Sequence, residues 1–173
     1  TEELTVQLLE LEGPSYMRTA RNKVSRMYDE ESKHELRIGT GSVLEEGKDV
    51  AIFSCGVMVE KAREAASALS EEGIECTVVD MHTIKPLDED LLARLSKMCG
   101  CFVSAEDHSI IGGLGGALAE WMSTNSPIPL EMVGVKDRFG ESGGSDELMK
   151  EVGLTSKSIC EAARKCIDRK NVA

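Results

Sequence analysis

The sequence predicts an α/β fold, a three-layer α/β/α arrangement around a mainly parallel sheet of about five strands. Short, continuous apolar runs such as residues 49–55 are typical of strands buried on both faces of a sheet. Longer segments lie between them, in which apolar residues recur at the spacing of one helix face. The two patterns alternate every roughly 20 to 30 residues, which indicates βαβ units and parallel strands covered by helices.

The expected elements follow in order along residues 42 to 170. Four apolar runs are predicted to be strands: 49–55, 74–80, 101–107 and 130–135. Helices are predicted between and after them: 56–73, 87–98, 116–122, 145–152 and a last helix from Thr155. Gly73 is placed to end the first of these helices, and Asp88 is placed as the N-cap of the second.

The N-terminal segment does not share this alternation. Residues 1–11 have leucines on one side of an expected helix, which Gly13 and Pro14 stop. Residues 15–19 then have the pattern of a single strand. The stretch 22–48 is charged and poorly periodic, as in a linker along a surface, and a short strand at 35–38 is one interpretation within it.

This contrast predicts the domain organisation. One helix and one strand cannot bury their own apolar faces. We therefore interpret residues 1–21 as the terminal helix-strand unit of a preceding domain, 22–41 as a linker, and 42–173 as the main α/β domain.

Composition excludes several classes of function. The 173 residues include 31 acidic and 20 basic side chains, an excess that disfavours nucleic acid as a partner. No apolar run approaches the roughly 18 residues of a membrane span, and no signal peptide opens the sequence. We expect a soluble, cytoplasmic protein with an aliphatic core, since aromatic residues make up only 3%.

Six cysteines need an interpretation. They are Cys55, Cys76, Cys99, Cys101, Cys160 and Cys166. Most fall in apolar runs, and the one C-x-C pair has no second pair at zinc-ligand spacing. We expect reduced, mostly buried thiols, with a metal site or a reactive thiol as the alternatives.

Four stretches of the sequence resemble one known family. They are, from the main domain, "VVDMHTIKPLDEDLL" (78–92), "SAEDHSIIGGLGGALAEW" (104–121) and "GVKDRFGESGGSDELMKEVGLTSKSICEAARK" (134–165), and, before it, "YMRTAR" (16–21). In this order and spacing they resemble the C-terminal third of transketolase, of the type split into two subunits. "YMRTAR" resembles the last strand of that family's pyrimidine-binding domain. Deoxyxylulose-phosphate synthase and the pyruvate dehydrogenase β chain share the architecture but fit these motifs less well.

The resemblance implies an enzyme that moves a two-carbon ketol unit between sugar phosphates. It uses thiamine diphosphate and a divalent cation, Mg²⁺ or Ca²⁺, held by an N-terminal domain or subunit through a GDG-type motif. This sequence contains no "GDG", and the resemblance assigns it no catalytic, cofactor-binding or metal-ligating residue. We therefore expect an assembly and support role, within a homodimer and beside a cofactor-binding partner, and no activity or cofactor binding by this chain alone.

Two arginines are candidate phosphate ligands. The resemblance implies that Arg21 reaches the phosphate of the substrate, and Arg18 is the weaker candidate. A guanidinium suits the role because it can donate two parallel hydrogen bonds to a phosphate. The alternative is that either arginine only pairs with surface carboxylates.

Glu106, Asp107 and His108 form a candidate ligand or interface site. They lie at the C-terminal end of a predicted strand, where parallel sheets bind ligands. The next glycines, 112–116, open a helix, and either cradle a phosphate or let the helix pack closely on the sheet. The competing function is therefore a small-ligand or nucleotide-sensing module. The loop 136–144 is expected to be a salt-bridged subunit contact.

Overall fold

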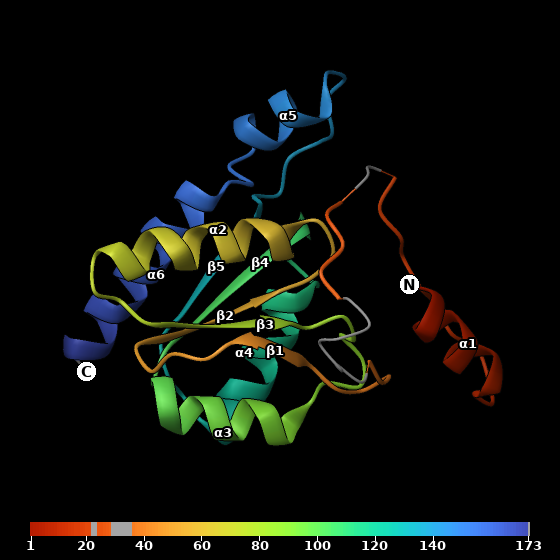
Figure 1. Ribbon diagram of the computed structural model, residues 1–173, viewed down its shortest axis with the longest axis horizontal. Helices are drawn as coiled ribbons and strands as arrows, with labels where there is room; N and C mark the ends of the chain where they lie inside the picture. The colour runs from red at the N-terminus through yellow and green to blue at the C-terminus, as the bar shows by residue number, and fades with distance from the viewer. Residues whose placement is uncertain (22–23, 29–35, 173) are drawn as a thin grey trace.

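A five-stranded sheet organises the chain, with the strand order β1-β3-β2-β4-β5. The structure is a computed structural model and describes residues 1–21, 24–28 and 36–172 (Figure 1). The strands are Ser42–Glu45 (β1), Val50–Ser54 (β2), Cys76–Asp80 (β3), Phe102–Ser109 (β4) and Leu130–Val135 (β5). Strands β2 to β5 pair in parallel, and β1 pairs antiparallel with β3 at one edge.

Helices cover both faces of the sheet, which confirms the predicted three layers (Figure 1). On one face lie α2 (Met58–Glu71) and α6 (Ser156–Val172), and on the other α3 (Glu89–Cys99) and α4 (Leu114–Asn125). Asp88 caps α3 as expected, since its carboxylate accepts a hydrogen bond from the Leu91 amide at 3.0 Å. Two shorter helices, α1 (Glu2–Glu10) and α5 (Ser145–Glu151), complete the chain. No helix in the described ranges is long and apolar enough to cross a membrane.

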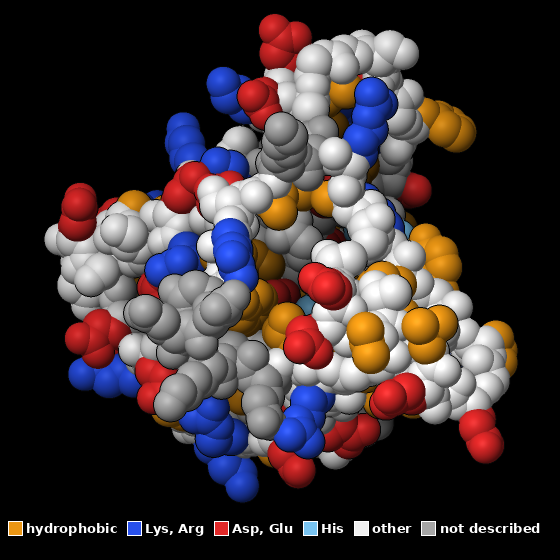
Figure 2. All heavy atoms as spheres, turned by 45° about the vertical axis from the view of Figure 1, so that its right-hand side comes forward, with side chains coloured by type: hydrophobic (Ala, Val, Ile, Leu, Met, Phe, Trp, Pro, Cys, Tyr) orange, Lys and Arg blue, Asp and Glu red, His pale blue; other side chains and the backbone are white. Residues whose placement is uncertain are grey.

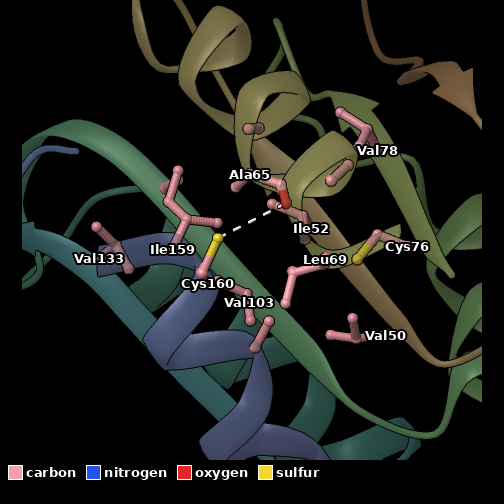
Figure 3. Close-up of a cluster of buried hydrophobic side chains, with 14 of the residues drawn as sticks. Val50, Ile52, Ala65, Leu69, Cys76, Val78, Val103, Val133, Ile159 and Cys160 are labelled. Carbon is pink, nitrogen blue, oxygen red and sulfur yellow. Dashed lines mark hydrogen bonds between the residues drawn. The ribbon is translucent and has the colours of Figure 1, made fainter. Parts of the chain in front are cut away.

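Two hydrophobic clusters hold the layers together, one on each face of the sheet. Side chains alternate along each strand, so Ile52 of β2 packs under α2 and α6 while Phe53 packs on the opposite side. Figure 3 shows the first cluster, where Ile159 and Cys160 of α6 meet Leu69 of α2 above the sheet. The thiol of Cys160 lies 3.6 Å from the Ala65 carbonyl oxygen.

The N-terminal part corrects two expectations. Residues 15–19 do not form a strand: they have no regular secondary structure and join no ladder in the described part of the chain. The described residues of the interpreted strand 35–38 are also not in a strand, and residue 35 lies outside the described ranges. Instead, β1 at Ser42–Glu45 supplies the edge strand, which the sequence analysis placed within a poorly periodic stretch. The expected first helix is confirmed as α1, although none of its residues is buried.

The glycines at the start of α4 allow close packing on the sheet. A Cβ atom added to Gly115 would lie 2.7 Å from Ser104 Oγ and 2.9 Å from Met132 Sδ, whereas one added to Gly116 would meet nothing within 4 Å. The close-packing interpretation is therefore confirmed for Gly115.

These two glycines give a matched pair of variants. Gly115→Ala should lower the free energy of unfolding by about 1–3 kcal/mol relative to Gly116→Ala, because the added methyl group overpacks the contact with the sheet. Both variants gain similar helix propensity, so this gain cancels in the comparison. Urea denaturation followed by circular dichroism measures the difference, and equal midpoints would contradict the packing argument.

Candidate functional site

The candidate site lies at the carboxyl ends of the parallel strands. The chain passes from β2 to β3 on one side and then crosses to β4 on the other, so β2 and β4 flank the point where the direction of strand order changes. Open α/β sheets usually bind ligands outside the strand ends at this point. Figure 2 turns this side forward and shows a hollow bordered by acidic, basic and apolar side chains. Cys55 follows β2, Asp80 ends β3, and Glu106 and Asp107 lie near the end of β4.

Glu106 is the central buried group of the site. Its side chain is only 1% exposed, and its carboxylate accepts hydrogen bonds from the amides of Leu114 at 2.7 Å and Gly115 at 2.8 Å. A Cβ atom on Gly113 would lie 2.0 Å from Glu106 Oε2, so the turn fits the carboxylate only with glycine at this position. The N-terminus of α4, which favours an anion, is therefore filled by an anion of the chain itself.

His108 lies beside this carboxylate. Its Nδ1 atom is 3.8 Å from Glu106 Oε2 and 2.8 Å from the carbonyl oxygen of Ser109, and its side chain is half exposed. In the described residues no group of three or more His, Cys, Asp or Glu side chains could hold a metal ion. The structure thus brings Glu106 and His108 together around a helix N-terminus.

Cys55 faces the same acidic surroundings. Burial, followed by the negative charges of Glu106 and Asp80, raises the pKa of this thiol to about 12, although Arg18 opposes the shift. Because the thiolate is the reactive form, Cys55 is unsuited to nucleophilic chemistry near neutral pH. The other five cysteines are buried and all six are free thiols, which agrees with the expected mostly buried thiols.

The described parts of the N-terminal segment contact the main domain near this edge of the sheet. Arg18 donates two hydrogen bonds to Asp107, to the backbone oxygen at 2.6 Å and to the carboxylate at 3.1 Å. Further along, Ser25 donates to Glu60 at 2.6 Å, on the first turn of α2. The third contact, from Tyr28 to Asp80, anchors the segment at the end of β3.

The pair of Tyr28 and Asp80 was not predicted from the sequence. The Tyr28 hydroxyl donates to Asp80 Oδ2 at 2.6 Å. Burial raises the pKa of the Asp80 carboxyl, and burial together with the Asp80 charge raises the pKa of Tyr28 far above its usual value. Asp80 could have been found by the rule that identified Glu106, because it also ends a buried parallel strand.

The structure separates the two candidate arginines. Arg18 is engaged by Asp107, as in the alternative interpretation of a pair with a carboxylate. Arg21 is exposed, and no hydrogen bond or ion pair joins it to another residue in the described parts of the chain. The expected salt bridges in the loop 136–144 are present, since Arg138 pairs with Glu141 and Glu151.

A groove of about 910 Å³ lies elsewhere, between α4, β5 and α6. Its lining includes Met122, Leu130 and Arg169. Arg169 donates to the carbonyl oxygen of Leu130 at 2.9 Å, so α6 closes part of the outer edge of β5. None of the residues singled out from the sequence lines this groove.

The chain matches a protein-family model and a solved structure over most of its length. Residues 39–159 match the family model described as "Transketolase, C-terminal domain". A solved structure described as "Split gene transketolase, inactive beta4 tetramer" superposes with a TM-score of 0.92 at 42% identity, covering 97% of this chain and 55% of the other.

Curated relatives give a consistent picture. The 6-deoxy-6-sulfo-D-fructose transketolase subunit SqwH of Clostridium sp. (strain MSTE9) is 44% identical over 165 residues, which are 95% of this chain and 51% of the relative. A 1-deoxy-D-xylulose-5-phosphate synthase of Rippkaea orientalis (strain PCC 8801 / RF-1) is 40% identical over 87% of this chain and 24% of the relative. The chain thus spans about half the length of the first relative and a quarter of the second.

Proposed function

Because the chain belongs to the family of the transketolase C-terminal domain, we propose that it is the C-terminal portion of a thiamine-diphosphate-dependent transketolase of the split type. The main support for this proposal is the match to a split-gene transketolase over 97% of this chain, which extends well beyond residues 39–159 of the family model. In this proposal the complete enzyme transfers a two-carbon ketol unit between sugar phosphates, in the cytoplasm and in the pentose phosphate pathway. The chain supports assembly as a homodimer with a cofactor-binding partner.

The domain boundaries follow from the same proposal. Residues 1–21 would end a pyrimidine-binding domain, 22–41 would connect it, and 42–173 would form the C-terminal domain. The exposed side of α1 supports this division, because Leu9 is 82% exposed and Val6 is 52% exposed. An apolar helix side of this kind is typical of an element that packs against a further part of its domain.

The side chains of this chain do not fit the cofactor. The described residues hold no cluster of carboxylates, cysteines or histidines for the divalent cation, and the sequence has no GDG motif. The helix N-terminus that a diphosphate would use at the carboxyl edge is filled by Glu106. We therefore assign thiamine diphosphate and Mg²⁺ or Ca²⁺ to the partner subunit and derive no chemical step in this chain.

The role left to this chain at the active site is to bind the phosphate of the substrate through Arg21. Arg18 is engaged by Asp107, whereas Arg21 is exposed and can donate two hydrogen bonds to a phosphate. The sulfosugar in the name of the Clostridium relative also carries an oxyanion, which a guanidinium binds in a similar way.

A selective kinetic effect tests this role. In the complete enzyme, Arg21→Ala should raise KM for phosphorylated acceptor sugars roughly tenfold or more, because a charge-assisted pair is lost, and should leave unphosphorylated acceptors unchanged. Steady-state kinetics with matched acceptors measure both values. An equal effect on the two acceptors would contradict the assignment.

The competing proposal, a nucleotide-sensing module, receives less support. It would use the strand ends near Glu106, but the amides of Leu114 and Gly115 are already bound to that carboxylate. A second anion at the same place would be repelled by the Glu106 carboxylate. Thermal-shift screening with nucleotides separates the two proposals, since a dependable rise in Tm would favour sensing.

A further inference from the structure

The contact between Arg18 and Asp107 has an unusual form for a surface ion pair. One guanidinium nitrogen bonds the backbone oxygen of Asp107 at 2.6 Å and the other bonds its carboxylate at 3.1 Å. A planar guanidinium held at two nitrogens has a fixed orientation, unlike one that touches a single carboxylate oxygen. The pair joins residues 89 positions apart, so it fixes the N-terminal segment to the main domain.

Asp107 lies in an irregular interval of β4, directly after the buried Glu106. Between Ala105 and Ser109 the register of β4 against β5 shifts, so β4 has two more residues than its partner strand in this interval. The side chain of the preceding Glu106 is buried and bonded to α4. The backbone oxygen of Asp107 therefore lies next to a buried, hydrogen-bonded residue of the main domain, and it accepts a hydrogen bond from Arg18.

The segment around Arg18 has little else to hold it. Within residues 9–21 every side chain is exposed except the half-buried Met17. In the described range 8–21, Arg18 alone forms side-chain hydrogen bonds or ion pairs with the main domain. Arg21 lies three residues further on, and a chain of this length spans at most about 10 Å.

We propose that Asp107 is a positioning residue, which binds Arg18 and thereby sets the place of Arg21 at the substrate phosphate. This inference rests on the proposed function, because it takes Arg21 as the phosphate ligand. Asp107 itself touches no substrate. An exposed ion pair of this kind contributes little to stability, so its consequence lies in geometry.

The test uses the complete enzyme with the variants Asp107→Asn, Arg18→Ala and the pair combined. Asp107→Asn should raise KM for phosphorylated acceptors roughly fivefold or more, with kcat at saturation within about twofold, because Arg21 is misplaced rather than lost. The combined variant should resemble Arg18→Ala alone, since both changes break one contact. Asp168→Asn, the same chemical change at an exposed position of α6, is the matched control and should leave both constants unchanged.

Unphosphorylated acceptors and the unfolding midpoint complete the test. Asp107→Asn should leave KM for unphosphorylated acceptors and the urea midpoint of unfolding unchanged. A merely structural role would instead shift the midpoint and raise KM for all acceptors equally. If Arg21→Ala is selective for phosphate and Asp107→Asn is not, the positioning role is wrong while the proposed function stands. If Arg21→Ala shows no selectivity, the phosphate-binding role fails first, and the positioning role fails with it.

Discussion

Replacing Glu106 with alanine is expected to lower the free energy of unfolding by about 2–4 kcal/mol. The carboxylate is 1% exposed and is the partner of two buried backbone amides, those of Leu114 and Gly115. Without it both amides lose their acceptor, and α4 loses the negative charge at its N-terminus. Urea denaturation measures the loss. Glu106→Gln should fall between wild type and Glu106→Ala, because an amide offers one acceptor for two donors.

A double-mutant cycle with Gly113 makes this prediction specific. In wild type, Gly113→Ala would place a Cβ atom 2.0 Å from Glu106 Oε2, so it should destabilise the chain. In the Glu106→Ala background this clash is absent and the contact with the half-exposed His108 ring, at 2.8 Å from Nδ1, remains, so Gly113→Ala should cost much less. Strictly additive effects of the two substitutions would show that Glu106 does not occupy the turn as described.

The buried elements could be predicted from the sequence because burial imposes a pattern. Strands β2 to β4 read as continuous apolar runs, since helices cover both of their faces. Strand β1 has no such run, because it lies at the edge and Ser42 is its one buried residue. Residues 15–19 show the opposite case: their composition favours a strand, but a strand needs a neighbour, and the described chain provides none.

The candidate site could be located from the sequence, but its contacts could not. Glu106, Asp107 and His108 were expected at a strand end, and they lie there. Their roles depend on the register shift in β4 and on the glycine turn that brings two amides onto Glu106. The partner of Arg18 is 89 residues away in the chain, so only the tertiary fold decides that Asp107 engages it.

The 173-residue chain alone is expected to show no transketolase turnover and no binding of thiamine diphosphate. The cofactor performs the chemistry, and the protein must hold its diphosphate, its metal and its pyrimidine ring in place. The described residues provide no metal-binding cluster, and the buried carboxylate of Glu106 already occupies the two amides at the N-terminus of α4 that a diphosphate would need.

Complementation should restore activity by a factor of at least about 1,000, since a missing cofactor site removes essentially all catalysis. Two samples are compared. The first is the chain alone, and the second is the chain extended at its N-terminus by a complete pyrimidine-binding domain and mixed with the GDG-bearing subunit. Calorimetric titration with thiamine diphosphate and Mg²⁺ reports cofactor binding, and a coupled assay of ketol transfer reports turnover. The complete mixture with Arg21→Ala is the internal control, because this variant enzyme should bind the cofactor normally and bind phosphorylated acceptors more weakly. Micromolar binding of the cofactor by the chain alone would place a cofactor site within these residues and overturn the assembly role.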